Sequence, residues 1–534
     1  MTADTLASLL IARAEDDRPG LMFEDEVWTW REHVAACLAA GAWLSARGAA
    51  RHVGVLSENV PGLLVLIGGA AVAGHVVVAL NPTRPVDELI RDARATDVDL
   101  VLADAPFGAL AREVAAPLGV PHLPLGHDLF RTRERVFGDA PAPGDLVMLI
   151  FTSGTSGRPR AVRITQRKLA VPGLSLAALL TPGDVVYCSM PLFHSGALMA
   201  AYAPAVASGA ALALRRRFSA SGLLPDLRRY GATYLHYVGK ALSYALATPE
   251  RPDDADNPLR IAFGNEGSAA ATRRFGQRYG CRVIDAFGST ETAISFTPDP
   301  SAPPGCLGRL PDGVRILDPF TGRPCPPARI EDGRLLNPDE AVGELVNTAG
   351  LGLFDGYYND PEADAERIRD GAFWSGDLAY ADQDGHVYFA GRGTERLRVD
   401  GENLAVAPIE AALREFGGVV EAAVYPVPDA AAGDQVMAAL VLEGDFDPAA
   451  FTAFLAARRD LGAKSLPRYV RLARELPQTP SHKVVKRHLA REAWRTADPV
   501  WWRAPGGLRP LTDADAKGIE EEFVRHGRHH LLET

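Results

Sequence analysis

The fold of this chain is decided by the stretch Leu149-Ile-Phe-Thr-Ser-Gly-Thr-Ser-Gly-Arg-Pro-Arg160. An apolar run from Leu146 to Phe151 predicts a buried strand, which leads into a loop of Thr, Ser and Gly closed by Arg158 and Arg160. Glycines let backbone N–H groups approach a polyphosphate, hydroxyls donate further hydrogen bonds, and guanidinium groups supply positive charge. The GxxxxGK[ST] spacing of a Walker loop is absent. The segment alone leaves open a phosphate-binding loop or an ordinary surface turn.

Length and composition bound the class of protein. With 534 residues the chain is too long for one hydrophobic core, so two or more domains are expected. A net charge of -11 argues against sequence-independent binding of nucleic acid, which requires a basic face. The five cysteines are scattered without a CxxC pair, which fits a reducing compartment and predicts neither a metal site nor a disulfide framework. The first residues lack a basic and apolar leader, so we expect a cytoplasmic protein.

One apolar segment, residues 62–80, approaches the length of a membrane-spanning helix. Gly68, Gly69 and Gly74 interrupt it, and its end, Val76-Val-Val-Ala-Leu80, is typical of a strand. We therefore predict a buried helix followed by a strand, and no transmembrane segment.

Strand-like and helix-like segments alternate through the first half of the chain. Residues 52–56, 76–80 and 99–103 are predicted strands, separated by helix-length segments such as residues 85–95. Such alternation indicates βαβ units and a largely parallel sheet with helices on its faces, so the predicted fold class is α/β. Ligands bind at the carboxyl ends of strands in this architecture, where we expect the loop from Thr152 to Gly157.

Three later strands also end in polar or glycine-containing turns. The turns are Pro191-Leu-Phe-His194, Phe263-Gly-Asn265 and Gly288-Ser-Thr-Glu291. Phe287, next to the last of them, can stack on a base, while this turn offers a hydroxyl for phosphate and a carboxylate for Mg²⁺. Each turn taken by itself also has a purely structural interpretation, with His194 as an ordinary core residue.

The second half of the chain differs in pattern. From Val342 onward short strands and turns follow one another, and Asp384-Gly385 is a hairpin signal. Beyond Arg392 we expect a separate unit with helices over residues 406–416 and 447–459 and strands over residues 421–427 and 435–442. The predicted organisation is a large N-terminal domain of βαβ-built sheets plus a β-rich subdomain, a small mobile α+β domain, and a C-terminal extension of unassigned role, over residues 1–392, 393–495 and 496–534.

Taken in order, these motifs resemble those of the adenylate-forming superfamily, which includes acyl-CoA synthetases, adenylation domains and luciferases. The resemblance covers about residues 20–490 and rests on TSGTSGRPR, PLFH, GSTE, a predicted turn at Trp374-Ser-Gly-Asp377 (WSGD), a GR hinge and PQTPSHK. Phe263-Gly-Asn-Glu-Gly267 and Asp400-Gly-Glu-Asn403 are most similar to the fatty-acid transport protein and very-long-chain acyl-CoA synthetase branch. The resemblance implies that ATP and Mg²⁺ convert a carboxylic acid to an acyl-adenylate, and that coenzyme A then accepts the acyl group.

The resemblance also implies a role for each motif, residue by residue. The β- and γ-phosphates would be held by Thr152, Ser153, Gly154, Thr155, Ser156, Gly157, Arg158 and Arg160. Thr290 would contact the α-phosphate, and Mg²⁺ would bind Glu291 with Thr152. The nucleoside would be held by Phe287, Gly264, Asn265 and Asp285 around adenine and by Asp377 and Arg392 at the ribose. His194 would stand where the acyl pocket opens.

On the small domain, the resemblance implies that Lys483 bridges the substrate carboxylate and the α-phosphate. Lysine is scarce in this chain, so a retained lysine is more informative than an arginine; the six are Lys168, Lys240, Lys464, Lys483, Lys486 and Lys517. After adenylation the small domain would swing about Gly393-Thr394 and present another face, including Gly401, to the thiol channel.

Four positions differ from the superfamily's commonest pattern: Phe287 replaces a tyrosine, Arg160 a lysine, Thr394 a charged hinge residue, and His482 the glycine before Lys483. A side chain at position 482 restricts φ beside the lysine, which motivates an alternative: a ligase that mainly forms thioesters from a supplied acyl-adenylate. Transfer to a carrier protein and a catalytically silent nucleotide-binding relative are further alternatives. We expect the acid to be hydrophobic, and the sequence leaves a homodimer open.

Overall fold

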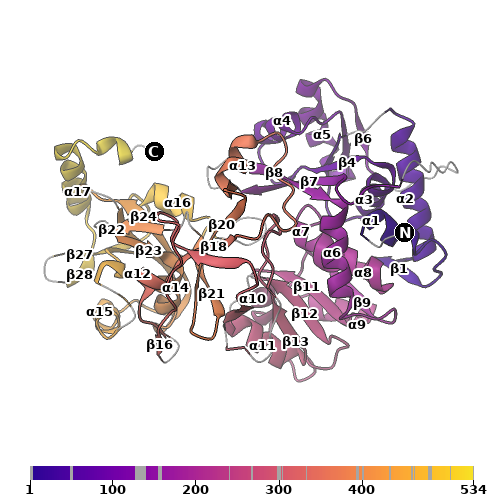
Figure 1. Ribbon diagram of the computed structural model, residues 1–534. Coiled ribbons are helices and arrows are strands. Elements are labelled where there is room, and N and C mark those ends of the chain that lie inside the picture. The colour runs from indigo at the N-terminus through magenta and orange to yellow at the C-terminus, as the bar shows by residue number, and fades with distance from the viewer. Residues whose placement is uncertain are drawn as a thin grey trace. The chain divides into compact units, whose positions relative to one another are not determined.

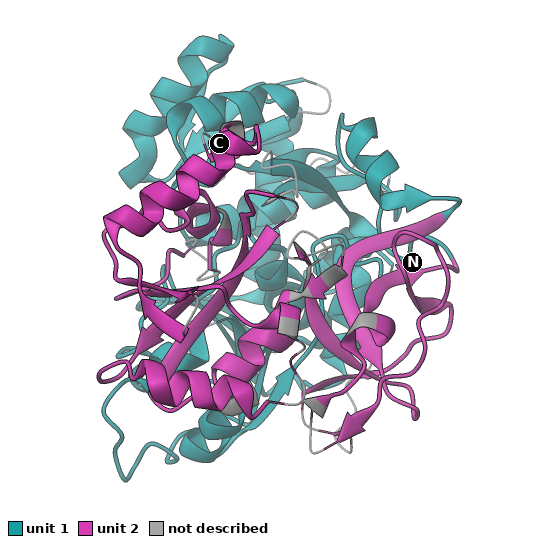
Figure 2. Ribbon diagram, turned by 90° about the vertical axis from the view of Figure 1, so that its left-hand side faces the viewer, with its two compact units in different colours: residues 1–298, 350–371 teal, residues 299–349, 372–534 magenta. Residues whose placement is uncertain are grey.

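The chain forms two compact units, coloured separately in Figure 2. Unit 1 comprises residues 1–298 and 350–371, and unit 2 comprises residues 299–349 and 372–534. A computed structural model describes residues 4–48, 52–126, 140–153, 159–239, 241–265, 269–296, 302–303, 305–331, 334–392, 396–399, 402–431, 434–458, 461, 463–478, 484–504 and 507–532. The expected hinge at Gly393-Thr394 lies outside these residues, so the domain boundaries stay a prediction.

The first sheet of unit 1 has seven strands in the order β13-β12-β11-β9-β10-β1-β2 (Figure 1). All neighbours are parallel except β1 and β2. The strands are β1 (Pro19–Phe23), β2 (Glu26–Thr29), β9 (Val185–Cys188), β10 (Ala211–Leu214), β11 (Tyr234–Val238), β12 (Ile261–Asn265) and β13 (Arg282–Asp285). The carboxyl ends of β9, β11, β12 and β13 therefore meet at one edge, where the polar turns were predicted.

The second sheet of unit 1 has six strands in the order β6-β5-β3-β4-β7-β8. Only β7 and β8 are antiparallel, because they form the hairpin that contains the Thr/Ser/Gly loop. The strands are β3 (His52–Leu56), β4 (Val76–Ala79), β5 (Leu100–Ala103), β6 (His122–Pro124), β7 (Leu146–Ser153) and β8 (Pro159–Thr165). The predicted α/β class and the strands at 52–56, 76–80 and 99–103 are confirmed.

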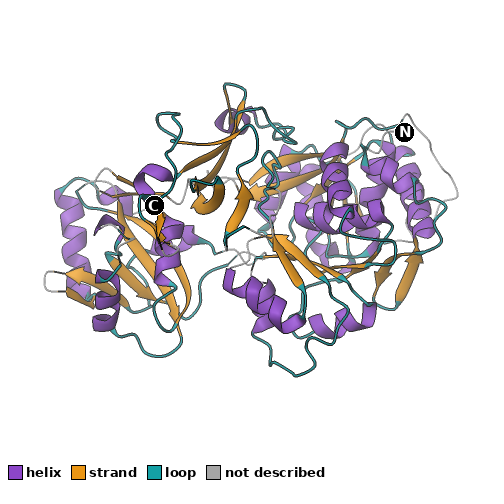
Figure 3. Cartoon of the chain, turned by 60° about the horizontal axis from the view of Figure 1, so that its bottom comes forward, coloured by secondary structure: helices purple, strands orange, loops and turns teal. Residues whose placement is uncertain are grey.

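Helices gather around the strands of unit 1 (Figure 3). They are α1 (Leu6–Ile11), α2 (Trp30–Ser45), α3 (Pro61–Ala73), α4 (Val86–Ala95), α5 (Gly108–Ala115), α6 (Gln166–Ala177), α7 (Ser195–Ala197), α8 (Ala203–Ser208), α9 (Leu223–Tyr230), α10 (Ala241–Leu246), α11 (Ala269–Tyr279) and α13 (Pro361–Arg367). The short elements η1 (Ala105–Phe107) and η2 (Ala116–Leu118) are 3₁₀ turns, and η4 (Leu198–Tyr202) is a π-helix.

The apolar segment at residues 62–80 is a buried helix followed by a strand, as predicted. Helix α3 packs closely on α2, since a Cβ on Gly69 would lie 2.6 Å from Ala40 Cβ. A Cβ on Gly68 would lie 2.4 Å from Cys37 Sγ. Its glycines therefore let two helices touch. Within the described parts of the chain, no helix is both long enough and apolar enough to cross a membrane.

Unit 2 begins with short antiparallel strands. The main path runs β14-β21-β20-β18-β15, and two small ladders stand apart from it. The path contains β14 (Cys306–Arg309), β15 (Val314–Leu317), β18 (Gly343–Asn347), β20 (Ala372–Ala381) and β21 (His386–Arg392). The small ladders are β16 (Ile330–Glu331) with β17 (Arg334–Leu335) and β22 (Arg396–Val399) with β23 (Glu402–Ala405). Asp384-Gly385 does form the turn of a hairpin, between β20 and β21.

The C-terminal part of unit 2 contains a five-stranded sheet in the order β24-β25-β26-β27-β28. Its strands are β24 (Val419–Pro428), β25 (Asp434–Leu442), β26 (Tyr469–Leu472), β27 (Val500–Ala504) and β28 (Gly507–Pro510). The helices of unit 2 are α12 (Pro338–Ala341), α14 (Val406–Leu413), α15 (Pro448–Ala456), α16 (Lys486–Glu492) and α17 (Asp513–Arg525), with 3₁₀ turns η6 (Ala463–Ser465) and η7 (His529–Leu532).

The segment after residue 496 has a structural position that the sequence left open. Strand β27 pairs with β26, and β28 pairs with β27, so this segment completes the five-stranded sheet. Trp501 packs against the core cluster on one face of the sheet, and Trp502 packs against the cluster on the other face. The two adjacent tryptophans point to opposite faces because side chains alternate along a strand.

Candidate active site

The β7–β8 hairpin brings both ends of the predicted phosphate loop together. Thr152 on β7 is the direct cross-strand partner of Arg160 on β8, and Ser153 pairs with Pro159. Residues Gly154, Thr155, Ser156, Gly157 and Arg158 lie outside the described residues. The strand that precedes the loop is buried from Val147 to Ile150, which anchors the loop at a defined edge of the sheet.

Arg160 is buried and already has one anionic partner. Its guanidinium forms an ion pair with Glu366, and its Cζ lies 5.5 Å from the centroid of the Tyr357 ring. Burial alone would lower the pKa of Arg160, but the bonded Glu366 carboxylate raises that pKa overall. Nη1 of Arg160 has no hydrogen-bond partner among the described residues. The side chain is thus fixed by Glu366 and retains one donor group for a ligand.

Tyr357 connects this hairpin to the predicted Mg²⁺ ligand. Residues 356–358 lie along β8, where the Arg163 N–H donates to the Gly356 carbonyl and the Tyr358 N–H donates to the Ala161 carbonyl. The Tyr357 hydroxyl donates to Oε1 of Glu291 at 2.9 Å. Burial raises the pKa of Tyr357 and the charge of Glu291 adds to the shift, so the phenol stays protonated as a donor at neutral pH.

Thr290 and His194 are brought close to each other by Ser195. The hydroxyls of Ser195 and Thr290 lie 3.0 Å apart in a hydrogen bond. His194 is the N-cap residue of α7, and its ring centroid lies 4.7 Å from that of Phe193. The turns PLFH and GSTE, remote in sequence, therefore meet in the fold.

Four predicted adenine-site residues gather at the ends of β12 and β13. Gly264 is the parallel partner of Asp285, and Asn265 is the last residue of β12. Asn265 Oδ1 is buried without a partner among the described residues. Phe287 follows β13, with its ring centroid 5.5 Å from that of Phe296. This edge thus presents an amide oxygen, a carboxylate and an aromatic ring.

Tyr237 fixes two of these residues from the neighbouring strand. Its hydroxyl donates to Oδ1 of Asp285 at 3.0 Å. A Cβ on Gly264 would lie 2.1 Å from the Tyr237 carbonyl oxygen and 2.7 Å from its ring, so only glycine fits there. The glycine at position 264 is thus required by strand packing, whatever it binds.

Asp377 and Arg392, the predicted ribose pair, lie in unit 2. They are direct cross-strand partners on β20 and β21, and Asp377 is buried. The Trp-Ser-Gly-Asp segment was predicted as a turn, and this is wrong: it lies inside β20, where Gly376 has φ 73 and its N–H donates to Glu344 Oε1 at 2.6 Å. A glycine in the left-handed region produces a local irregularity within the strand, which resembles a turn in sequence.

Two predicted residues belong to the small domain. Lys483, with His482 before it, and Gly401 lie outside the described residues, so their roles stay predictions. Three residues that hold predicted site residues by hydrogen bonds were not predicted: Ser195, Tyr237 and Tyr357. Each acts through a contact with a distant segment. Two of them had a signal in the sequence. Ser195 directly follows His194, and Tyr237 lies near the end of a strand.

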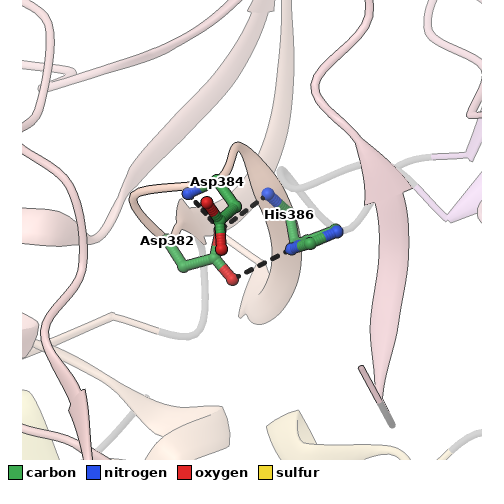
Figure 4. A group of neighbouring side chains, drawn as sticks. All are labelled: Asp382, Asp384 and His386. Atoms are coloured by element: carbon green, nitrogen blue, oxygen red, sulfur yellow. Dashed lines mark hydrogen bonds and ion pairs between the residues drawn. The ribbon is translucent and has the colours of Figure 1, made fainter. Parts of the chain in front are cut away.

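A separate group of polar side chains stands at the β20–β21 turn (Figure 4). Ligand atoms of Asp382, Asp384 and His386 lie within 4.8 Å of one another, a spacing that suits a metal ion. However, Asp382 Oδ1 accepts from the backbone N–H groups of Asp384 at 3.0 Å and His386 at 2.9 Å. Its Oδ2 lies 3.2 Å from His386 Nδ1. We interpret the group as the hydrogen bonding that closes the hairpin.

Comparison with known proteins places the chain in a family. The AMP-binding enzyme family matches residues 11–358, and the AMP-binding enzyme C-terminal domain matches residues 408–483. The chain therefore belongs to the AMP-binding enzymes, which confirms the resemblance to adenylate-forming acyl-CoA synthetases. The finer similarity to the fatty-acid transport protein branch stays a prediction.

Particular relatives are similar over nearly the whole chain. A medium/long-chain-fatty-acid–CoA ligase of Mycobacterium marinum is 47% identical over 94% of this chain and 99% of its own length. A steroid-22-oyl-CoA synthetase of Rhodococcus jostii is 45% identical over 99% of both chains. Among solved structures, ATP-bound MatB from Rhodopseudomonas palustris has a TM-score of 0.82 at 26% identity, covering 92% of this chain and 98% of its own.

Proposed function

We propose that this chain is an acyl-CoA ligase that activates a hydrophobic carboxylic acid with ATP and transfers it to coenzyme A. The observation that carries the proposal is 47% identity over 94% of the chain to a fatty-acid–CoA ligase. Two contacts support it: Tyr357 connects Glu291 with Arg160, and Ser195 connects Thr290 with the turn that contains His194. The medium/long-chain fatty acids and the steroid side-chain acid in the relatives' names are the two acid classes we propose.

The described residues suit a nucleotide and a magnesium ion. Glu291 and Thr152 offer a carboxylate and a hydroxyl, the oxygen ligands that Mg²⁺ prefers, and the bound ion would neutralise phosphate charge. Asn265 Oδ1 and Arg160 Nη1 are buried polar atoms without partners among the described residues. An adenine amino group and a phosphate oxygen are the groups that would satisfy them. The donor set therefore fits ATP with Mg²⁺.

The chain's own residues supply position and charge for the displacement at the α-phosphate. Arg160 and Thr152 hold the pyrophosphate end, and Thr290, fixed by Ser195, donates toward the α-phosphate. Lys483 brings a cation to the two anions that must approach each other. Asp377 accepts from the ribose hydroxyls, a task its buried position on β20 suits.

An apolar acid is supported by the segment that follows His194. The π-helix η4 is buried and contains Leu198, Met199, Ala200, Ala201 and Tyr202. Its Met199 sulfur lies 3.8 Å from the Thr292 hydroxyl, two residues after Thr290. No charged side chain occurs from Ser195 to Ser208. The apolar residues near Thr290, the proposed α-phosphate contact, thus favour a hydrophobic acyl group.

Product formation over a panel of acids tests this proposal. Purified chain with ATP, Mg²⁺ and coenzyme A should convert dodecanoate, hexadecanoate or a steroid-22-oic acid to its CoA thioester, detected by mass spectrometry. Sulfoacetate, a small dianion, is the negative control. Formation of a thioester from sulfoacetate and from none of the other acids would refute the proposal of a hydrophobic acid. Faster transfer to a carrier protein than to coenzyme A at equal concentration would refute coenzyme A as the acceptor. A cytoplasmic location and a homodimer stay predictions.

A further inference from the structure

Thr292, two residues after Thr290, has a backbone conformation that a threonine rarely adopts. Its φ is 54°, in the left-handed region, where the branched Cβ crowds the backbone. Six non-glycine residues in the described parts of the chain have positive φ, and Thr292 is the only β-branched one among them. Such a conformation is strained, so it persists only where the surrounding structure holds it in place.

The hydroxyl of Thr292 closes the turn that contains Thr290 and Glu291. It lies 3.2 Å from the carbonyl oxygen of Ser289 and 3.3 Å from that of Thr290, within reach as a donor to either. The N–H of Thr292 also donates to the Ser289 carbonyl, at 3.1 Å. The side chain and the backbone of Thr292 therefore fold the chain back onto the two residues before Glu291.

Two segments that are distant in sequence hold the strained residue from outside the turn. The sulfur of Met199, in η4, lies 3.8 Å from the Thr292 hydroxyl. The Leu353 N–H donates to the Thr292 carbonyl at 3.2 Å. A Cβ on Gly352 would lie 2.6 Å from the Ala293 carbonyl oxygen, so the chain at Gly352 is packed directly against this turn. The surroundings thus fix a conformation that the threonine would not adopt by itself.

The position of Thr290 depends on this turn. Its hydroxyl is hydrogen-bonded to that of Ser195 at 3.0 Å, and its carbonyl oxygen faces the Thr292 hydroxyl. A donor fixed in advance needs no rearrangement during the reaction. We propose that Thr292 is a positioning residue, whose left-handed backbone and hydroxyl fix the Thr290 hydroxyl for the α-phosphate. This role rests on the proposed function, which assigns the α-phosphate contact to Thr290.

Two substitutions separate positioning from fold stability. Thr292→Ala removes the hydroxyl and keeps a Cβ, whereas Thr292→Gly also relieves the strain at positive φ. In thermal unfolding, Thr292→Gly should therefore have a midpoint at least as high as that of Thr292→Ala. Its maximal rate of ATP–pyrophosphate exchange should nevertheless be about tenfold lower than that of Thr292→Ala, because a glycine leaves the turn free to move. The KM for MgATP should change little, since the lost contact acts in the transition state.

Two further variants are the controls. Thr292→Ser keeps the hydroxyl and should retain most of the exchange rate. Glu24→Gly relieves a φ of 54° in the exposed turn between β1 and β2, and should leave the exchange rate unchanged. Where Thr292→Ala is not recovered as a folded protein, Thr292→Asn replaces it, because asparagine tolerates the left-handed region; it should exchange faster than Thr292→Gly.

The outcomes distinguish this role from the proposed function. If the unmutated chain shows exchange, the role of Thr292 alone is overturned by a Thr292→Gly protein that exchanges as fast as Thr292→Ala, or whose defect lies only in the KM for MgATP. A Thr292→Gly protein that unfolds below Thr292→Ala, or does not fold, overturns the strain on which the role depends. Absence of exchange by the unmutated chain with every acid of the panel refutes the proposed function, and the role of Thr292 with it.

Discussion

Among the described residues, Tyr357 links three parts of the candidate site. Its backbone lies along β8, its ring faces the Arg160 guanidinium, and its hydroxyl holds Glu291. The phosphate end and the metal ligand thus share one rigid aromatic side chain. A rotation of this ring would disturb both groups at once.

Tyr357→Phe removes the hydroxyl and keeps the ring. A hydrogen bond to a charged group contributes about 1.5–3 kcal/mol, so we expect the KM for MgATP to rise roughly tenfold or more. Tyr358→Phe is the matched control, because its hydroxyl donates to the exposed Asp97 at 2.9 Å, away from Glu291. Steady-state kinetics of both variants check this, and equal KM values would contradict the role given to Tyr357.

Sequence reasoning found residues that belong to local motifs and missed those that act across the fold. Thr290 and Glu291 were predicted because a turn at a strand end presents both. Tyr357 lies 66 residues after Glu291, and Ser195 lies 95 residues before Thr290. Apart from the position of Ser195 directly after His194, nothing local to these two residues indicates such a contact, because the sheet order decides which segments meet.

At the scale of elements, the close approach of β11 and β12 determines the shape of the adenine edge. Gly264 faces the backbone and ring of Tyr237, whose hydroxyl in turn holds Asp285. The lack of a side chain at Gly264 is therefore needed for the strand packing that positions Asn265 and Asp285.

Gly264→Ala tests this packing. The new Cβ would lie 2.1 Å from the Tyr237 carbonyl oxygen, so one strand must move, and we expect a loss of at least about 3 kcal/mol of unfolding free energy. Gly108→Ala, at the start of α5, meets nothing within 4 Å and should change stability little. Denaturant unfolding of both variants measures the difference. A stable Gly264→Ala protein would show that the strands are not held this closely.

Elements with strong periodicity were predicted well, and elements defined by a distant partner were not. The helix and strand within residues 62–80 follow from apolar runs and glycines. The strands β27 and β28 were missed because each is a strand only through pairing: β27 pairs with β26, which ends at Leu472, and β28 pairs with β27. The strand around Gly376 was predicted as a turn because Ser-Gly-Asp is typical of turns. In the structure the same glycine, with positive φ, lies within a strand.

For the whole molecule, the candidate residues are divided between the two units. The phosphate, adenine and metal groups belong to unit 1, whereas Asp377, Arg392, Gly401 and Lys483 belong to unit 2. The motifs that the resemblance assigns to adenylation are thus carried by both units. We expect Lys483 to be needed for adenylation and not for thioester formation. Its place in unit 2 fits a small domain that moves between these two half-reactions.

ATP–pyrophosphate exchange by the full chain with a hydrophobic acid tests the central claim most directly, since it reports adenylation without thioester formation. We predict acid-dependent exchange that falls by at least about 100-fold in Lys483→Ala, because a charge that stabilises the transition state is lost. The account would be contradicted by a chain that shows no exchange with any acid of the panel but converts a supplied acyl-adenylate to its CoA thioester.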